Sequence, residues 1–266
     1  MREQILSKLA PGHPWGELLQ YYPCVDSTNT LAKTMAAQGA PHGTVIVAGT
    51  QTAGRGRLGR SFHSPGSSGL YFSAILRPDC TAGELMHLTC AVAVAVCGAI
   101  EAVTGLRPGI KWINDLVWGK RKIAGILTEL SLVPGSSRVA WAVVGIGVNC
   151  CQREEDFPPE LQPIAGSLSM ATGTEVSPAA IAAAIMEKLC CLDAVLLTDK
   201  TGIMNRYRSR CITIGQEVSL HRADTASHAL AVGIDDEGAL LVKYPDGRTE
   251  AVNSGEASVR GMYGYV

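Results

Sequence analysis

The chain has 266 residues, of which 47% are hydrophobic and 18% are charged, and its formal net charge at pH 7 is −1. This composition predicts a globular protein with a large core and room for a smaller second domain. The balanced charge argues against a nucleic-acid or anionic-membrane surface, so a cluster of arginines has to be a local site.

The cysteines indicate the cellular compartment. The nine cysteines include adjacent pairs at residues 150–151 and 190–191 but no C-x-x-C motif. An odd count without disulfide spacing is typical of a reducing environment, and the first residues lack the basic and apolar regions of a secretory signal. We therefore expect a cytoplasmic protein.

The first predicted elements are a helix and two strands. Residues 26–29 offer N-cap side chains, and Gly39 can end a helix of about ten residues in a left-handed conformation. Residues 44–48 and 70–76 are rich in apolar and β-branched side chains and predict strands. The segment between them is predicted to be a loop.

This loop contains the run G-R-G-R-L-G-R at residues 54–60. Glycines let backbone N–H groups approach a ligand closely, and arginines supply fork-shaped donors that suit phosphate and carboxylate groups. The run therefore predicts an anion-binding loop, with a solvated basic turn as the simpler alternative.

The same run matches the Rossmann pattern G-x-G-x-x-G and, with Arg60 in place of lysine, a Walker A loop. Both motifs need a helix that begins at the last glycine. Residues 62–69 contain one proline, two glycines and three serines, which favours a loop instead. The sequence therefore argues against both nucleotide-binding motifs.

Residues 88–100 are the most apolar stretch of the chain. Their number is well below the roughly 20 residues that cross a bilayer. Small side chains within the stretch and the flanking Glu84 and Glu101 instead predict a buried core helix that ends near Gly105. We expect no membrane partner.

Apolar or alternating runs predict four further strands, at residues 109–112, 115–118, 122–130 and 139–148, with a turn at residues 119–120. Glycine weakens a strand, so Gly125, Gly145 and Gly147 predict places where a ligand or another backbone comes close. A β-bulge is the alternative.

The remainder divides into a loop, a helix and a strand-rich end. Residues 152–173 predict a loop because Phe157 precedes two prolines, and Ser177 with Pro178 predicts the start of a long alanine-rich helix. Short strands at regular spacing from residue 212 onward predict a small β-barrel. We therefore expect two domains, residues 1–211 and 212–266.

Residues 111–115, K-W-I-N-D, place a lysine at a strand end. Strand alternation puts Lys111 on the opposite face from Ile110 and Trp112, where it faces either a cavity or solvent. Asn114 and Asp115 can equally be turn residues. The alternation leaves a site and a solvated edge both open.

Five motifs together resemble those of the biotin protein ligase family. They are the run at residues 54–60, S-P at 64–65 with G-L-Y at 69–71, K-W at 111–112 with N-D at 114–115, K-I-A-G-I-L at 122–127 and G-I-G-V-N at 145–149. The resemblance covers residues 24–150, and Gly255 and Glu256 resemble that family's C-terminal domain.

The resemblance implies an α/β (α+β) catalytic domain with a mixed sheet, similar to class II aminoacyl-tRNA synthetases, followed by an SH3-like barrel. It implies that biotin and ATP, with Mg²⁺, form biotinyl-5′-AMP, from which biotin passes to a lysine of a biotin carboxyl carrier protein or domain, such as that of acetyl-CoA carboxylase. Dense cationic donors suit a reaction that brings a carboxylate to a polyphosphate.

The resemblance also implies roles for individual residues. Biotin contacts are expected from Ser27, Thr28, Asn29, Gln51, Gly54, Arg55, Arg57, Lys111, Gly125 and Gly145. ATP or adenylate contacts are expected from Arg55, Arg57, Arg60, Phe62, Lys111, Asn114, Gly147 and Asn149. Lys111, as a bridge between the biotin carboxylate and the α-phosphate, and Arg57 are expected to take part in the chemistry, and no protein metal ligand is assigned.

Two positions depart from the family pattern. Phe62 stands where many members have tryptophan and Ile113 where many have proline, which puts adenine stacking and the rigidity of the turn after Lys111 in question. The alternative is a lipoate or octanoate ligase of the same superfamily, although its adjacent arginines ahead of a glycine run are absent. The segment before Ser27 is too short for the winged helix of a ligase-repressor, so we expect no DNA partner, and a monomer or weak homodimer.

Overall fold

The computed structural model describes residues 1–66, 68–222, 225–254 and 258–261. Gly255 and Glu256, which resemble the family's C-terminal domain, lie outside these residues.

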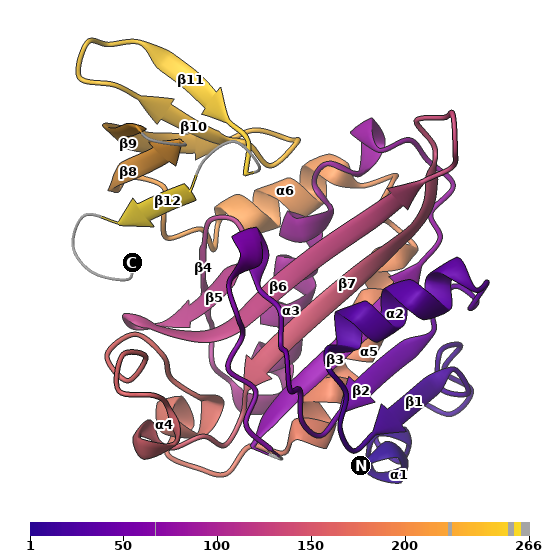
Figure 1. The fold of residues 1–266 in the computed structure, drawn as a ribbon. Helices are drawn as coiled ribbons and strands as arrows, with labels where there is room; N and C mark the ends of the chain where they lie inside the picture. The colour runs from indigo at the N-terminus through magenta and orange to yellow at the C-terminus, as the bar shows by residue number, and fades with distance from the viewer. Residues whose placement is uncertain (67, 223–224, 255–257, 262–266) are drawn as a thin grey trace.

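The larger part of the fold is a seven-stranded sheet with the order β1-β2-β3-β7-β6-β5-β4 (Figure 1). β1 and β2 pair in parallel, whereas the other neighbours pair antiparallel, so the predicted mixed sheet is confirmed. Its strands are β1 (Leu19–Tyr22), β2 (Val45–Ala48), β3 (Gly69–Leu76), β4 (Gly109–Lys111), β5 (Asp115–Trp118), β6 (Arg121–Leu132) and β7 (Val139–Asn149).

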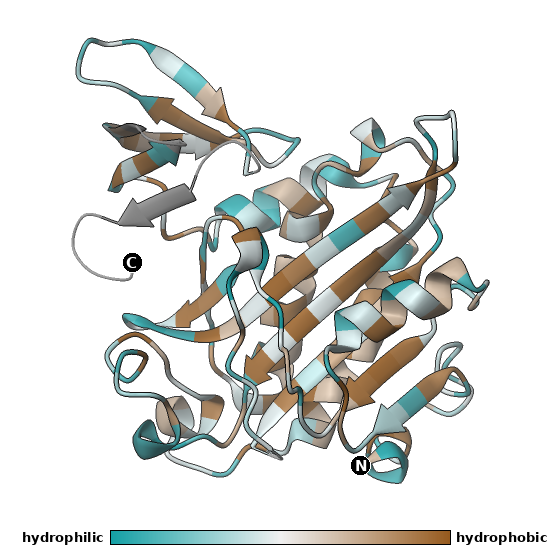
Figure 2. Ribbon diagram, viewed as in Figure 1, coloured by the Kyte–Doolittle hydropathy of each residue, from teal (hydrophilic) through white to brown (hydrophobic). Residues whose placement is uncertain are grey.

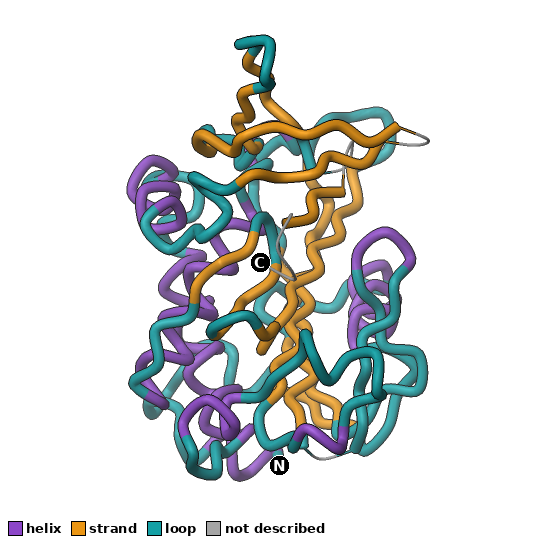
Figure 3. Tube along the Cα trace, turned by 90° about the vertical axis from the view of Figure 1, so that its left-hand side faces the viewer, coloured by secondary structure: helices purple, strands orange, loops and turns teal. Residues whose placement is uncertain are grey.

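Helices cover both faces of this sheet (Figures 1 and 3). On one face α3 (Leu88–Thr104) packs against α5 (Pro178–Asp193), with α6 (Lys200–Arg208) beside α3 and α1 (Arg2–Leu6) beside α5. α2 (Thr28–Ala37) covers part of the other face, where Ala32 and Ala36 pack against Ile46, Ile75 and Val143. The first residues of α2 therefore lie beside the part of this face that no helix covers (Figure 1).

The main core lies between the sheet and α3. Val92, Val96 and Ile100 are fully buried, and Gly105 ends the helix with φ 72°, as predicted. The stretch Gly83–Thr104 is long and apolar enough to cross a membrane by length and composition, but 61% of its apolar window is buried inside the fold. These features fit a core helix, and Figure 2 shows hydrophobic residues concentrated along the sheet strands beside it.

A second, antiparallel sheet with the order β11-β10-β9-β8-β12 follows at one end of the fold (Figure 3). Its strands are β8 (Glu217–Arg222), β9 (Thr225–Ile234), β10 (Leu240–Lys243), β11 (Thr249–Val252) and β12 (Ser258–Gly261). The expected small β domain after a mixed α/β domain is thereby confirmed.

Some elements differ from the sequence predictions. α1, β1 and α6 had no predicted counterpart, although Ile203, Met204 and Tyr207 of α6 bury one face at helical spacing. The segment predicted as a loop at residues 152–173 contains a 3-10 turn at Glu154–Asp156 and the short helix α4 (Leu168–Thr172). α4 forms because Ser167 Oγ accepts a hydrogen bond from the backbone N–H of Met170.

Candidate functional site

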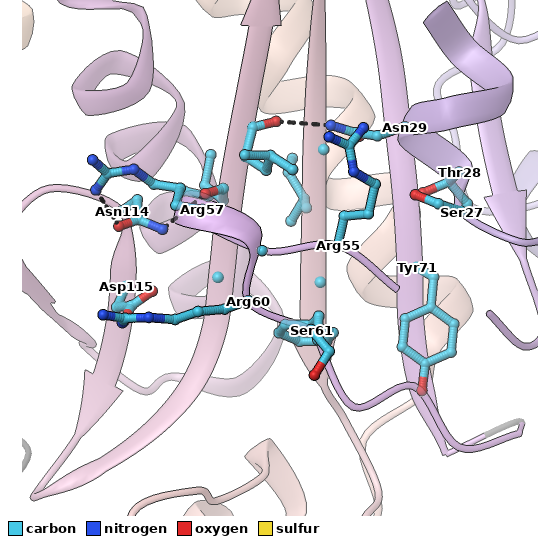
Figure 4. A pocket seen from close by; sticks show the side chains of 18 of the residues that line it. Ser27, Thr28, Asn29, Arg55, Arg57, Arg60, Ser61, Tyr71, Asn114 and Asp115 are labelled. Carbon is cyan, nitrogen blue, oxygen red and sulfur yellow. Dashed lines mark hydrogen bonds between the residues drawn. The ribbon is translucent and has the colours of Figure 1, made fainter. Parts of the chain in front are cut away.

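A cavity of about 520 Å³ opens beside the start of α2 on the partly uncovered face of the sheet (Figure 4). Five cationic side chains line it, those of Arg55, Arg57, Arg60, Lys111 and Lys122. Asp115 is the one acidic residue among the described residues that line it. This excess of positive charge suits a ligand with several negative charges.

The glycine-arginine loop, residues 54–62, folds back on itself above the cavity. The N–H of Gly56 donates to the carbonyl of Arg60 over 2.7 Å, and the N–H of Phe62 donates to the carbonyl of Gly54 over 2.9 Å. The interior of the loop is a single 3-10 turn, Arg57–Gly59, in which Leu58 has φ 55°. No helix begins at Gly59, so the argument against the Rossmann and Walker motifs is confirmed.

Arg57 connects this loop to two distant segments. Its Nη1 donates to Asn114 Oδ1 over 3.0 Å, and its Nη2 donates to the carbonyl of Ser254, beyond β11, over 2.6 Å. Burial lowers the pKa of the Arg57 guanidinium, and the charge of Asp115 opposes this effect. Arginine starts so far above neutral that the group stays cationic.

Lys122 also belongs to the site, although sequence reasoning assigned it no role. Its Nζ lies 2.6 Å from Asp115 Oδ1 and 5.9 Å from the centre of the Phe62 ring. The N–H of Lys122 donates to the carbonyl of Ile164, and its carbonyl accepts from the N–H of Gly166. The sequence did contain a signal for this residue, because Lys122 is the first residue of the motif K-I-A-G-I-L that contains Gly125.

Lys111 faces the cavity, which decides between the two alternatives that the alternation left open. Its neighbours Ile110 and Trp112 are buried, with 0% and 6% exposure. Asp115 likewise lines the cavity while pairing with Lys122, so it does more than shape a turn.

The end of the cavity beside the start of α2 is lined by the uncharged polar residues Ser27, Thr28, Asn29 and Gln51, and Arg55 reaches it from the loop (Figure 4). The backbone N–H and the Oγ1 of Thr28 both donate to Gln51 Oε1, over 2.9 and 3.2 Å, and Gln51 Nε2 donates to Ser64 Oγ. The helix predicted from residues 26–29 is present, but Ser27 makes no side-chain cap bond, and Gln51 accepts the first-turn N–H instead. Figure 4 shows Thr28 and Asn29 on one side of the cavity and Arg57 with Asn114 on the other.

The strand glycines leave room for side chains of the site. A Cβ at Gly145 would lie 2.0 Å from Asn29 Oδ1, and one at Gly147 would lie 2.6 Å from the Phe62 ring. A Cβ at Gly125 would lie 3.0 Å from Lys122 Nζ. The register of β7 with β3 and β6 is continuous past Gly145 and Gly147, so the bulge alternative is wrong for these two, whereas β6 has a register shift against β5 at residues 122–124, next to Gly125. The atoms that lie closest to these three glycines therefore belong to side chains and not to another stretch of backbone.

Most of the residues assigned to the site line this one cavity. They are Ser27, Thr28, Asn29, Gln51, Arg55, Arg57, Arg60, Phe62, Lys111, Asn114, Gly125, Gly145 and Gly147. Gly54 is not among the lining residues and lies against Phe62 and Ser64 at the base of the loop. Asn149 is not among them either, and its Nδ2 donates to the carbonyl of Gly166 over 2.8 Å. The ligand contacts assigned to all of these residues, those that line the cavity included, stay predictions.

Comparison with known proteins adds two family matches. The Biotin/lipoate A/B protein ligase family matches residues 21–149, and the Biotin protein ligase C terminal domain matches residues 213–260.

Individual relatives cover most of the chain. The Bifunctional ligase/repressor BirA of Bacillus spizizenii is 38% identical over 236 residues, which are 87% of this chain and 71% of that protein. The Biotin--[acetyl-CoA-carboxylase] ligase of Paracoccus denitrificans is 33% identical over 230 residues, 84% of this chain and 93% of that protein. The structure of biotin protein ligase from Aquifex aeolicus in complex with biotin and ATP has a TM-score of 0.76 at 29% identity and covers 91% of this chain and 98% of that one.

Gly145→Ala should destabilise the fold through Asn29. The added Cβ would overlap Asn29 Oδ1, which Ser73 Oγ contacts at 2.7 Å, so we expect a loss of about 1–3 kcal/mol in the free energy of unfolding. Chemical denaturation measures this loss. The variant Asn29→Ala/Gly145→Ala should lose less than the sum of the two single losses, since the overlap is gone. Gly233→Ala in β9, where a Cβ has no neighbour closer than 3.5 Å, is the control. Additive losses in the double variant would contradict the overlap.

Proposed function

The chain belongs to the biotin protein ligase family, and on this premise we propose how its cavity carries out the ATP-dependent ligation of biotin. The relatives are biotin ligases, which favours this activity over the lipoate or octanoate alternative. The observation that carries the mechanism is the set of five cations around one cavity.

The two ends of the cavity suit the two ends of biotin. We assign the ureido and thiophene end to the polar groups of Ser27, Thr28 and Gln51, which present hydroxyl and amide donors and acceptors. The carboxylate then points toward Lys111 and the glycine-arginine loop, where ATP binds with Phe62 beside its adenine. Holding both substrates in one cavity converts a bimolecular reaction into an effectively intramolecular one.

In the first step, a carboxylate oxygen of biotin attacks the α-phosphorus of ATP. The bond to the pyrophosphate oxygen breaks, and pyrophosphate leaves with the electron pair. Negative charge gathers around the phosphorus, so Lys111, Lys122 and Arg57 stabilise the transition state more than the separate substrates. Arg55 and Arg60, which lie on the loop, offset the remaining negative charge of the phosphates.

In the second step, the neutral amine of the carrier lysine attacks the carbonyl carbon of biotinyl-5′-AMP. The carbon–oxygen bond to phosphate breaks, AMP leaves with the electron pair, and the amine loses a proton. We assign the acceptor to a biotin carboxyl carrier protein or domain of a biotin-dependent carboxylase.

Mg²⁺ accompanies ATP in this proposal. No group of three or more His, Cys, Asp or Glu side chains that could hold a metal occurs in the described part of the chain. Mg²⁺ usually keeps several waters and binds through one or two carboxylates together with substrate phosphates, which Asp115 in the cavity fits. Bound there, Mg²⁺ would neutralise part of the negative charge of the ATP phosphates.

The C-terminal part of the chain supports the site from outside the cavity. Trp112 Nε1 donates to the carbonyl of Gly238 over 2.9 Å, and the N–H of Trp112 donates to Thr213 Oγ1 over 2.9 Å. Trp112 follows Lys111 directly, so these bonds hold the lysine in place. We assign to the domain at residues 212–266 the positioning of the site.

We place the reaction in the cytoplasm, as a monomer or weak homodimer. All nine cysteines are unpaired in the structure, which is compatible with a reducing compartment.

Carrier labelling tests the function as a whole. The purified chain, with biotin, ATP and Mg²⁺, should attach biotin to an isolated carrier domain, as detected by streptavidin blotting. A carrier with its acceptor lysine replaced by arginine is the control and should stay unlabelled. An unlabelled wild-type carrier would contradict the proposed function.

Lys111→Ala should lower the rate of adenylate formation by at least about 100-fold, because a cation beside the phosphorus acts mainly in the transition state. Lys122→Ala should give a loss of similar order, since its amine lies in the same cavity. Single-turnover synthesis of biotinyl-5′-AMP measures both, and Lys120→Ala in the adjacent exposed turn is the control. Near wild-type synthesis by either variant would remove that lysine from the mechanism.

Arg57→Ala should retain some adenylate synthesis but release the product. If the loop is a lid, losing its bonds to Asn114 and Ser254 opens it, and the freed anhydride then reacts with lysines of bystander proteins. Biotin incorporation into albumin measures this release. Labelling that stays confined to the carrier would argue against the lid.

A further inference from the structure

Glu129 contacts the glycine-arginine loop from outside the cavity. It lies on β6, its side chain is 22% exposed, and it is not one of the residues that line the cavity. Arg55 Nη1 lies 3.2 Å from Glu129 Oε1. The pair joins the first arginine of the loop to the sheet.

Two further side chains contact the Glu129 carboxylate. Lys33 Nζ on α2 lies 2.8 Å from Oε1, and Asn29 Nδ2 donates to Oε2 over 3.1 Å. Burial by itself would raise the pKa of Glu129, but the hydrogen bonds from Lys33 and Asn29, with the charges of Lys33 and Arg55, outweigh it and lower the pKa. Glu129 is therefore an anion at neutral pH and stays so into the acid range.

The negative charge of Glu129 matters for the loop because the loop carries several positive charges. The three arginines of the loop line the same cavity as Lys111 and Lys122, so without a ligand their mutual repulsion favours an open loop. Arg57 donates its two side-chain hydrogen bonds to neutral groups, Asn114 and the Ser254 carbonyl, while the carboxylate of Asp115 attracts it from within the cavity. Glu129 supplies a negative charge at the start of the loop.

We propose that Glu129 is the electrostatic tether that holds the glycine-arginine loop closed, and that it thereby sets how long biotinyl-5′-AMP stays in the cavity. The effect on the retention of biotinyl-5′-AMP rests on the proposed function. Glu129 is a positioning residue that acts through Arg55, so its loss should speed release of the adenylate while leaving its synthesis largely intact.

Limited trypsin digestion tests the tether without any ligand. Trypsin cuts after arginine, and the loop offers Arg55, Arg57 and Arg60. Glu129→Gln keeps an oxygen that can accept from Asn29 but loses the charge, so cleavage within the loop, followed by mass spectrometry, should become about fivefold faster. Thermal unfolding of the variant checks that the fold is intact.

Lys33→Met is the matched control, because it removes a partner of Glu129 but leaves the pair with Arg55. Its loop should be cut at the wild-type rate. In an Arg55→Met background, Glu129→Gln should add no further acceleration, since the partner is already gone. Equal cutting of wild type and Glu129→Gln, equal acceleration by Lys33→Met, or full additivity with Arg55→Met would each overturn the tether.

Product retention tests the consequence. With preformed biotinyl-5′-AMP, Glu129→Gln should release the adenylate about fivefold faster than wild type, at a rate of synthesis within about twofold of wild type. Equal release rates would overturn the role in retention. If the wild-type chain makes and binds no biotinyl-5′-AMP, the proposed function fails, while the trypsin experiment still decides whether Glu129 holds the loop.

Discussion

Mutual repulsion among five cations around one cavity is the constraint on which the rest of the structure depends. Two unit charges 4 Å apart repel by about 4 kcal/mol at the effective dielectric near a protein surface. The fold brings the cations together from three elements: the loop for Arg55, Arg57 and Arg60, the end of β4 for Lys111 and the start of β6 for Lys122. The same repulsion is relieved when a polyanion binds.

The sheet and its neighbours provide the rigidity that this arrangement needs. Gly145 and Gly147 leave space above β7 for Asn29 and Phe62, so side chains from α2 and from the loop both reach the cavity floor. From the other side, the turn between β9 and β10 reaches Trp112 through the carbonyl of Gly238, and the carbonyl of Ser254 accepts from Arg57. Two parts of the chain thus contribute contacts to one site.

Much of this could be predicted from the sequence, and the remainder shows where local patterns end. The helix at Thr28–Ala37, the buried helix that ends at Gly105 and the glycine-arginine loop all have local signals, in caps, hydrophobic runs and glycines. Lys122 stood in a recognised motif but was not assigned a role. Glu129 and Ser254 could not be found, because they lie 74 and 197 residues from the arginines they contact. Only the tertiary fold brings such positions together.

The central claim is that this cavity activates biotin by joining it to the α-phosphate of ATP, and isotope exchange between pyrophosphate and ATP tests it most directly. The exchange reports the reversible first step alone, without a carrier. We expect labelled pyrophosphate to enter ATP when biotin is present, and neither without biotin nor with lipoate in its place. Exchange that does not depend on biotin, or that lipoate supports equally well, would contradict the account.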